Sequence, residues 1–224
     1  MRYSSTKILR DYGITIGLAI SVALFIRSYG IEAYRIPSIT MKPTLLPGDI
    51  IFAAKWPFKI THYTPKRGDV IVFEDLNAPG SNFIKRIIGL PKDQIQIRRG
   101  LVYLNGTKLV TTQTDNPQCL KEQLPEGKTY SVCLEMPSLE TDGVKTVPPN
   151  SVFVMSDLRG GASVSKSKTP SDAQKFADWG IVPLSSLNGK ALWIWLSVEP
   201  NQEFGKNSGW FPRLRFHRMF QEIL

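Results

Sequence analysis

The longest apolar run of the chain lies near its N-terminus. Residues 12–26 read YGITIGLAISVALFI, and the weakly apolar residues 27–31 extend this run to about the 20 residues that a membrane-spanning helix needs. Arg27 interrupts the run, but an arginine near a helix end can reach the membrane surface with its guanidinium group. We therefore expect a transmembrane anchor at residues 12–31, preceded by a short cytoplasmic segment at residues 1–11.

The charges before this run predict its orientation. Arg2, Lys7 and Arg10 precede it, and an excess of positive charge normally stays on the cytoplasmic side of a membrane. Residues 32–224 would then form an exported domain. A cleavable signal peptide is the alternative. The bulky residues around Arg27 leave few of the small side chains that a cleavage site needs, so a retained anchor is favoured.

After the anchor the apolar runs become short, as β-strands require. They lie at residues 50–54, 69–73, 151–155 and 191–196. Residues 94–98 alternate polar and apolar side chains, which is the period of a half-buried strand, and Asn105-Gly106 is a strong signal for a hairpin turn. The pattern predicts a mainly β, antiparallel fold behind an N-terminal transmembrane helix.

Residues 105–147 are polar and rich in turn-forming residues, which predicts an inserted β-ribbon. Cys119 and Cys133 bracket a Pro-Glu-Gly turn within it. Because exported domains meet oxidising conditions, we expect a disulfide between them, worth about 3 kcal/mol for a ring of about 15 residues. No metal site is expected, because His62 and His217 lack ligand spacing relative to the cysteines.

Composition and charge limit the classes of function. The 224 residues, 42% of them hydrophobic, suffice for one principal domain with a small insertion. A formal charge of +9 and a pI near 9.6 suit either nucleic acid or an anionic membrane surface. No RRM core, zinc-finger spacing or helix-turn-helix pattern is visible in the sequence. We therefore expect a lipid bilayer as a partner and no nucleic acid.

The first candidate site is the segment IPSITMKPTLLPGD at residues 36–49. Pro37 and Pro43 fix their own φ angles and disfavour a helix in the residues before them. We expect an extended backbone that holds the hydroxyls of Ser38 and Thr40 close to the membrane. Such a segment is either a mount for a nucleophile or an ordinary linker.

The second candidate is Lys85, within the predicted strand FIKRIIG at residues 83–89. Apolar neighbours flank it closely, so most of its stem leaves bulk water whichever face it takes. Burial disfavours the charged ammonium group and can lower the pKa of a lysine by as much as about 3–5 units. A lysine of this kind can accept a proton from a hydroxyl near neutral pH. The alternative is a strand lysine that extends its amine to solvent.

These two segments belong to a longer series of blocks. In chain order the series reads IPSITMKPTLLPGD, RGDVIVF, FIKRIIGLPKDQI, VFVMSDLRGG, DWGIVP and GKALWIWLS. In order and spacing it resembles the type I signal peptidases, the membrane-bound serine peptidases that remove signal peptides. The resemblance covers residues 36–196 and implies the two-part β fold of that family, signal-peptide-bearing preproteins as substrates, and no cofactor. We expect a monomer.

The resemblance also implies roles for individual residues. Thr40 takes the position of the nucleophile and Lys85 that of the general base, while the Ser38 hydroxyl and the Thr40 amide would bind the oxyanion. Asp157 and Arg159 would support the site. The positions that line or adjoin the substrate pockets are Ile36, Pro37, Met41, Leu45, Phe83 and Ile84.

The chain departs from the family pattern at two places. Thr40 stands where the family has a serine, and its β-branched side chain is bulkier and restricted in χ1. The block VFVMSDLRGG keeps an acid and a base as Asp157 and Arg159, but the serine and acid that follow it in the family have no clear counterpart here. The candidates for these positions are Ser163, Ser171, Asp172 and Asp178.

The sequence therefore predicts a single-pass endopeptidase of a bacterial-type plasma membrane or a thylakoid membrane. Its N-terminus would be cytoplasmic, and its catalytic domain would remove signal peptides after small residues of the Ala-x-Ala type. The alternative is a catalytically weak or inactive paralogue that binds exported peptides or signal sequences at the membrane. Cleavage of a preprotein distinguishes the two.

Overall fold

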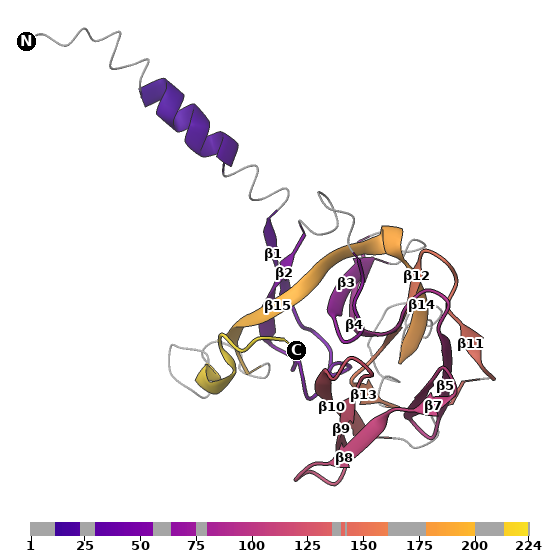
Figure 1. Ribbon diagram of the computed structural model, residues 1–224. Coiled ribbons are helices and arrows are strands. Elements are labelled where there is room, and N and C mark those ends of the chain that lie inside the picture. Colours follow the sequence, from indigo (N-terminus) through magenta and orange to yellow (C-terminus); the bar gives the residue numbers. More distant parts are fainter. Residues whose placement is uncertain are drawn as a thin grey trace, which may run out of the picture.

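The computed structural model describes residues 12–22, 30–55, 64–74, 80–135, 140–141, 143–160, 178–199 and 213–223. Residues 12–22 form an α-helix that extends away from a β body (Figure 1). Within the described ranges, no helix has the length and apolar character needed to cross a membrane. The anchor expected at residues 12–31 stays a prediction.

The largest sheet has seven strands, and each is antiparallel to its neighbours. In spatial order they are β1 (Ile31–Arg35), β2 (Asp49–Ala54), β15 (Leu187–Ser197), β3 (Val70–Glu74), β4 (Asn82–Gly89), β12 (Ser151–Met155) and β14 (Trp179–Pro183). The late strand β15 lies between the early strands β2 and β3. Strands from the early and the late part of the chain are thereby neighbours in one sheet.

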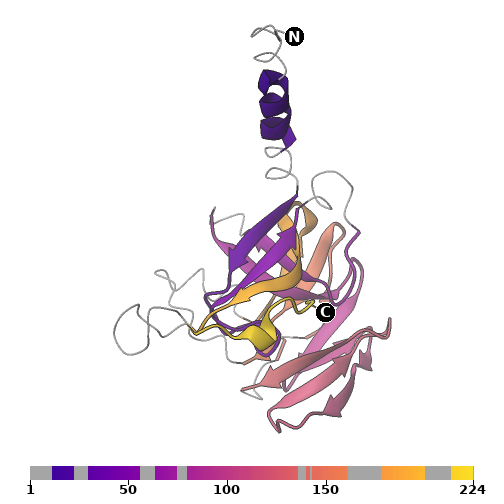
Figure 2. The same cartoon turned by 90° about the vertical axis from the view of Figure 1, so that its left-hand side faces the viewer.

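Two four-stranded sheets complete the body (Figure 2). One has the order β13 (Leu158–Arg159), β10 (Thr129–Leu134), β9 (Cys119–Gln123) and β8 (Val110–Gln113), and the other β11 (Lys145–Thr146), β5 (Gln94–Arg98), β6 (Leu101–Leu104) and β7 (Thr107–Lys108). Their pairs are antiparallel except β10 with β13, which is parallel. Among the described residues there are two short 3-10 helices, η2 (Leu184–Ser186) directly before β15 and η3 (Phe216–Arg218) close to the C-terminus. The prediction of a mainly β, antiparallel fold is confirmed.

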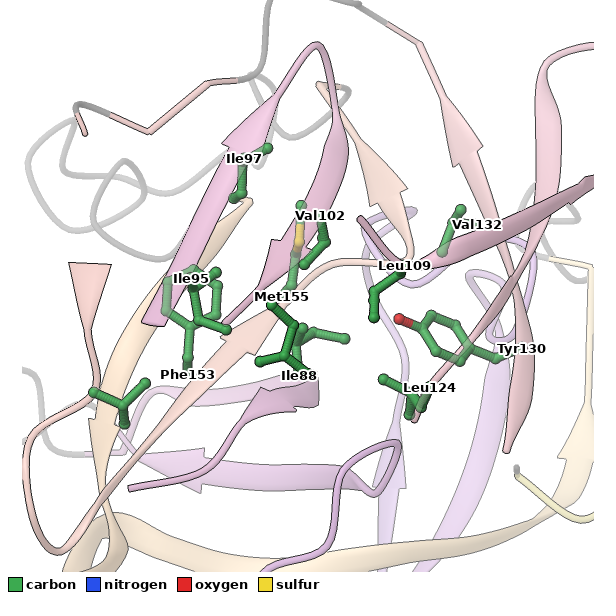
Figure 3. Close-up of a cluster of buried hydrophobic side chains, with 12 residues drawn as sticks. Ile88, Ile95, Ile97, Val102, Leu109, Leu124, Tyr130, Val132, Phe153 and Met155 are labelled. Carbon is green, nitrogen blue, oxygen red and sulfur yellow. The ribbon is translucent and has the colours of Figure 1, made fainter. Parts of the chain in front are cut away.

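Apolar side chains cover both faces of β12, and this explains its unbroken apolar run. Phe153 and Met155 belong to one buried cluster, whereas Val152 and Val154 belong to another. Successive side chains of a strand point to opposite faces, so a strand between two clusters must be apolar throughout. Figure 3 shows the first cluster, which gathers side chains of β4, β5 and β6 with those of β10 and β12.

The ribbon of β8, β9 and β10 extends to one end of the body (Figure 1). Cys119 and Cys133 lie directly opposite each other in β9 and β10, and a disulfide joins them. The other face of the ribbon carries Tyr130 and Val132 into the cluster of Figure 3. Side chains thus pack the ribbon against the large sheet, and the disulfide links its strands β9 and β10 to each other.

Candidate active site

Residues 36–49 form a loop whose two ends are hydrogen-bonded to each other. The Ile36 amide donates to the Asp49 carbonyl at 2.8 Å, and the Gly48 amide donates to the Ile36 carbonyl at 2.9 Å. Gly48 has a φ of +87°, and a Cβ there would lie 2.0 Å from the Val198 carbonyl oxygen. Only glycine fits this position, so it closes the loop against the end of β15.

The expectation of an extended backbone is wrong for the centre of this loop. The Lys42 amide donates to the Ile39 carbonyl at 2.9 Å, and the Leu45 amide donates to the Met41 carbonyl at 2.8 Å. These two turns direct Met41 and Leu45 into a buried apolar cluster with Ile36. Burial of apolar side chains therefore decides the path of the backbone at the centre of the loop.

The buried carboxylate of Asp49 anchors the end of the loop. It accepts hydrogen bonds from the Leu46 amide at 2.8 Å and from the Ser197 hydroxyl at 2.6 Å. Arg215 and Arg218 of the C-terminal segment also reach it, at 3.1 and 2.7 Å. Side chains of β15 and of the C-terminal segment thus bind Asp49 together. These contacts restrict the movement of the loop.

The two hydroxyls of the loop are in direct contact. Ser38 Oγ and Thr40 Oγ1 lie 3.0 Å apart, within hydrogen-bond distance. The carbonyl oxygen of Thr40 accepts a hydrogen bond of 3.0 Å from the Leu158 amide. The structure therefore places the predicted nucleophile and its predicted oxyanion partner together, and it ties Thr40 to the segment that follows β12.

Lys85 reaches the same segment from β4. It is 2% exposed, and its Nζ donates to the hydroxyl of Ser156 at 2.6 Å. Arg86 is opposite Met155 in the antiparallel register of β4 and β12, so Ser156, the first residue after β12, comes beside Lys85. Sequence reasoning missed Ser156 as a site residue, because only the strand register reveals the contact.

Burial is the main cause of a lowered pKa for Lys85. The pKa falls from the ordinary 10.5 to about 8, while the negative charges of Asp178 and Asp157 act in the opposite direction and raise it. The ammonium group loses more hydration than these carboxylates replace. Lys85 is therefore poised to lose its proton in mildly alkaline solution, as a general base requires.

Replacing Lys85 by methionine is expected to stabilise the protein at neutral pH by about 3 kcal/mol, the free energy that corresponds to the gap between pKa values of 10.5 and about 8. Below pH 8 the lysine is protonated in both the folded and the unfolded state, and the folded state buries that charge. Between pH 8 and 10.5 the unfolded state binds more protons. The free energy of unfolding of the parent protein should therefore rise relative to that of the variant across this range.

Urea unfolding of both proteins at pH 7 and at pH 10 measures this difference. Lys190→Met is the matched control, because the Lys190 side chain is 33% exposed and pairs with Asp69 at 2.9 Å; such a pair contributes about 0–1 kcal/mol. Equal stability of the Lys85 variant and the parent at both pH values would show that burial of the charge has no cost.

A buried ion pair lies next to Lys85. Both nitrogens of one edge of the Arg86 guanidinium group contact the Asp157 carboxylate, at 2.8 and 2.7 Å. The hydroxyl of Thr44 donates to the same carboxylate at 2.5 Å. Asp157 thus joins β4 to the loop of residues 36–49, and it acts on Lys85 through its charge.

Arg159 lies farther into the ribbon. It forms a buried ion pair with Glu122 at 2.6 Å, and Glu122 also accepts a hydrogen bond from the Tyr130 hydroxyl. The Arg86 guanidinium carbon lies 4.3 Å from the centre of the Tyr130 ring, which connects the two ion pairs. Arg159 therefore braces the ribbon against the site, whereas Asp157 adjoins the site itself. Glu122 and Tyr130 were not anticipated from the sequence.

The residues expected at the substrate pockets fall into three environments. Ile36, Met41 and Leu45 are buried together, with Ile84 half-buried against the same cluster. Phe83 belongs to a different cluster and stacks on Phe73, with ring centres 5.7 Å apart. Pro37 is exposed. The loop of residues 36–49 and β4 therefore meet in one apolar cluster through Ile84.

The candidates for bracing Lys85 are only partly within the described structure. Ser163, Ser171 and Asp172 lie outside the described residues. Asp178 accepts a hydrogen bond from the Ser156 amide at 2.7 Å through its carbonyl oxygen, and its carboxylate accepts one from the Gly160 amide at 3.2 Å. Asp178 therefore fixes the backbone around Ser156. In the part of the chain that the structure covers, no group of three or more His, Cys, Asp or Glu side chains is placed to hold a metal ion.

This arrangement has the parts that acyl transfer requires. A hydroxyl in contact with a second hydroxyl can attack a carbonyl carbon, and a buried amine of lowered pKa can take up the proton. Both are tied to the segment Ser156–Leu158, one through a side chain and one through a backbone carbonyl. The structure therefore brings a candidate nucleophile and a candidate base to one segment of the chain.

The sequence of this chain is similar to those of known proteins over most of its length. Residues 9–196 match the family model described as "Signal peptidase, peptidase S26". The signal peptidase I of Rickettsia bellii (strain OSU 85-389) is 28% identical over 92% of this chain and 83% of its own length, and that of Rickettsia typhi is 27% identical over 98% and 96%. A crystal structure of a signal peptidase I from Enterococcus faecalis V583 is 23% identical, covers 57% of this chain and 96% of its own, and superposes with a TM-score of 0.31.

Proposed function

We propose that this chain, which belongs to the signal peptidase family (peptidase S26), removes N-terminal signal peptides from exported preproteins with Thr40 as its nucleophile and Lys85 as its general base. Membership makes it a hydrolase of the serine-peptidase type. The observation that carries the assignment of the base is the burial of Lys85, which lowers its pKa to about 8.

The reaction proceeds by acyl transfer. Neutral Lys85 takes the proton of the Thr40 hydroxyl, whose oxygen attacks the scissile carbonyl carbon. The protonated lysine then gives the proton to the leaving amine, and an ester to Thr40 remains. Lys85 next takes a proton from a water molecule, which hydrolyses the ester and frees Thr40.

The oxyanion of each tetrahedral intermediate is bound by the Thr40 amide and the Ser38 hydroxyl. Support comes from the 3.0 Å contact between Ser38 Oγ and Thr40 Oγ1, which places the second donor beside the nucleophile. Removing a single donor of this kind commonly reduces the rate by about 10²–10³-fold. Ser38 also remains as a polar neighbour that orients the Thr40 hydroxyl in the free enzyme.

The substrate binds as an extended strand, with small residues at the first and third positions before the cut. Backbone hydrogen bonds to a strand edge supply affinity, and shallow pockets for alternate side chains supply selectivity. The burial of Ile36, Met41 and Leu45 supports this proposal, because it packs the loop that carries both hydroxyls firmly against the core. Ala-x-Ala sequences present the small side chains that shallow pockets admit.

The enzyme acts at a membrane, anchored by residues 12–31 with its N-terminus in the cytoplasm and the β body on the exported side. A bacterial-type plasma membrane or a thylakoid membrane fits this topology, and the chain works as a monomer in contact with lipid. The supporting observations are the apolar run and the basic residues before it.

A second function is favoured by one feature of the site. Thr40 carries a methyl group on Cβ, which restricts χ1 and occupies space beside the scissile carbonyl. A chain in which this methyl prevents attack would bind signal sequences or exported peptides without cleaving them. It would then be a membrane-attached binding protein with the family fold.

Purified full-length protein in detergent is expected to cleave a preprotein whose signal peptide ends in Ala-x-Ala, and N-terminal sequencing of the product should place the cut after the second alanine. The matched control is the same preprotein with tryptophan at that alanine, which a small pocket excludes. Retained binding of the preprotein with no product in detergent or in lipid would establish the binding protein instead.

A further inference from the structure

The short strand β13 has two different neighbours. On one side it pairs in parallel with β10, where the Cys133 amide donates to the Asp157 carbonyl and the Glu135 amide to the Arg159 carbonyl, both at 2.9 Å. Backbone groups of successive residues in a strand point to opposite sides. The Leu158 amide therefore points away from β10, and it donates to the Thr40 carbonyl at 3.0 Å.

This hydrogen bond completes the fixation of the backbone at Thr40. A peptide unit is planar, so the Ile39 carbonyl, which accepts from the Lys42 amide at 2.9 Å, also fixes the direction of the Thr40 amide. The Thr40 carbonyl is held by Leu158. One of the two peptide planes at Thr40 is thus fixed from within the loop and the other from the ribbon sheet.

The side chain of Leu158 packs on the disulfide. Cys133 is opposite Leu158 in the register of β10 and β13 and opposite Cys119 in the register of β10 and β9. The two cysteines and Leu158 form a buried cluster of their own, with exposures of 6%, 4% and 1%. One residue therefore touches the disulfide with its side chain and holds the predicted nucleophile with its amide.

We propose that Leu158 is a positioning residue for Thr40 and that the Cys119–Cys133 disulfide holds Leu158 in place. The ribbon thereby determines the direction in which the Thr40 hydroxyl points. The proposal rests on the proposed function. Because a β-branched side chain is stiff at χ1, the direction of the Thr40 hydroxyl follows its backbone. A small displacement of the Thr40 carbonyl is then passed directly to the attacking oxygen.

The expected kinetic effect is a loss of kcat without a comparable change in KM. Misplacing a reacting group by about 1 Å can reduce the rate as much as about 10²-fold, whereas the apolar residues expected to bind substrate lie in a separate cluster with Ile36. Leu158→Ala and the double variant Cys119→Ser/Cys133→Ser should each lower kcat by about 10–10²-fold. The pH midpoint of cleavage should be the same as in the parent protein, because it is set by the pKa of Lys85.

Val132→Ala is the matched control. Val132 is fully buried in β10 next to Cys133, but its side chain joins the large cluster of Figure 3 on the opposite face. The substitution loosens the ribbon to a similar degree without touching Leu158. Its kcat should stay close to that of the parent at a temperature where circular dichroism shows every variant folded.

Hydrogen exchange of the Leu158 amide, followed by mass spectrometry of peptides, tests the same link without catalysis. The amide should exchange faster in Cys119→Ser/Cys133→Ser, and in the parent reduced with a phosphine, but not in Val132→Ala. Equal loss of kcat in Val132→Ala and Leu158→Ala overturns the proposal, as does an unchanged exchange rate after loss of the disulfide. If the parent cleaves nothing, the proposed function fails, and exchange alone decides whether the disulfide holds Leu158 against Thr40.

Discussion

Cleavage of a preprotein is expected to fall by about 10²–10⁴-fold when Lys85 is replaced by methionine, because general-base catalysis contributes a factor of that size. The variant keeps the length of the side chain but cannot accept a proton. In the parent protein kcat/KM should rise with pH through about 8, where Lys85 becomes neutral. The residual activity of the variant should lack this rise.

Thr40→Ala removes the proposed nucleophile and should reduce the rate of cleavage at least as much as Lys85→Met does. Residues that act as a unit are not additive in their effects, so the double variant Thr40→Ala/Lys85→Met should be no slower than the slower single variant. Rates of preprotein cleavage under single-turnover conditions measure all three. Thr40→Ser keeps the hydroxyl and removes the methyl group, and it is expected to match or exceed the parent.

The controls for this pair lie on the same body. Lys190→Met and Thr112→Ala change the same residue types at partly or fully exposed positions, and both should leave cleavage unchanged. Lys85→Met should be less active and yet more stable than the parent, which is the signature of a residue kept for function against its cost to folding. Full activity of Lys85→Met would remove Lys85 from the mechanism.

Replacing Asp157 by asparagine is expected to lower the free energy of unfolding by about 3–5 kcal/mol, because the fully buried Arg86 would be left with an uncompensated charge. Denaturant unfolding at neutral pH measures the loss. The charge of Asp157 also raises the pKa of Lys85. In the same variant the pH midpoint of cleavage should therefore move to lower pH.

Glu122→Gln separates these two effects. It leaves Arg159 unpaired in the interior and should lower the free energy of unfolding by a similar amount. Glu122 lies in the ribbon, however, and it is not among the causes of the pKa shift of Lys85. Its pH midpoint should match that of the parent. A midpoint that moves equally in both variants would mean that loss of stability, not the charge of Asp157, sets the titration. The double variant Arg86→Met/Asp157→Leu should regain much of the lost stability, because neither charge of this pair then remains in the interior.

The sequence predicted the parts of this protein that depend on local pattern. Apolar runs marked β3, β12 and β15, alternation marked β5, and the crowding of apolar residues made Lys85 a candidate for a buried lysine. The order of the blocks was enough to indicate the family. The extended backbone predicted for residues 36–49 was wrong at its centre, because Met41 and Leu45 turn the chain toward a core that local rules do not contain.

The partners of these residues depend on pairing across the chain. Ser156 meets Lys85 only through the register of β4 and β12, the Arg159–Glu122 pair joins residues 37 positions apart, and Leu158 reaches Thr40 through a two-residue strand. A register shift of one residue would reverse the direction of every side chain, and nothing local fixes that register. The sequence by itself therefore determined which hydroxyl and which amine are the candidates for catalysis. Only the tertiary structure decided what surrounds them, because desolvation and strand register arise from the packing of segments far apart in the chain.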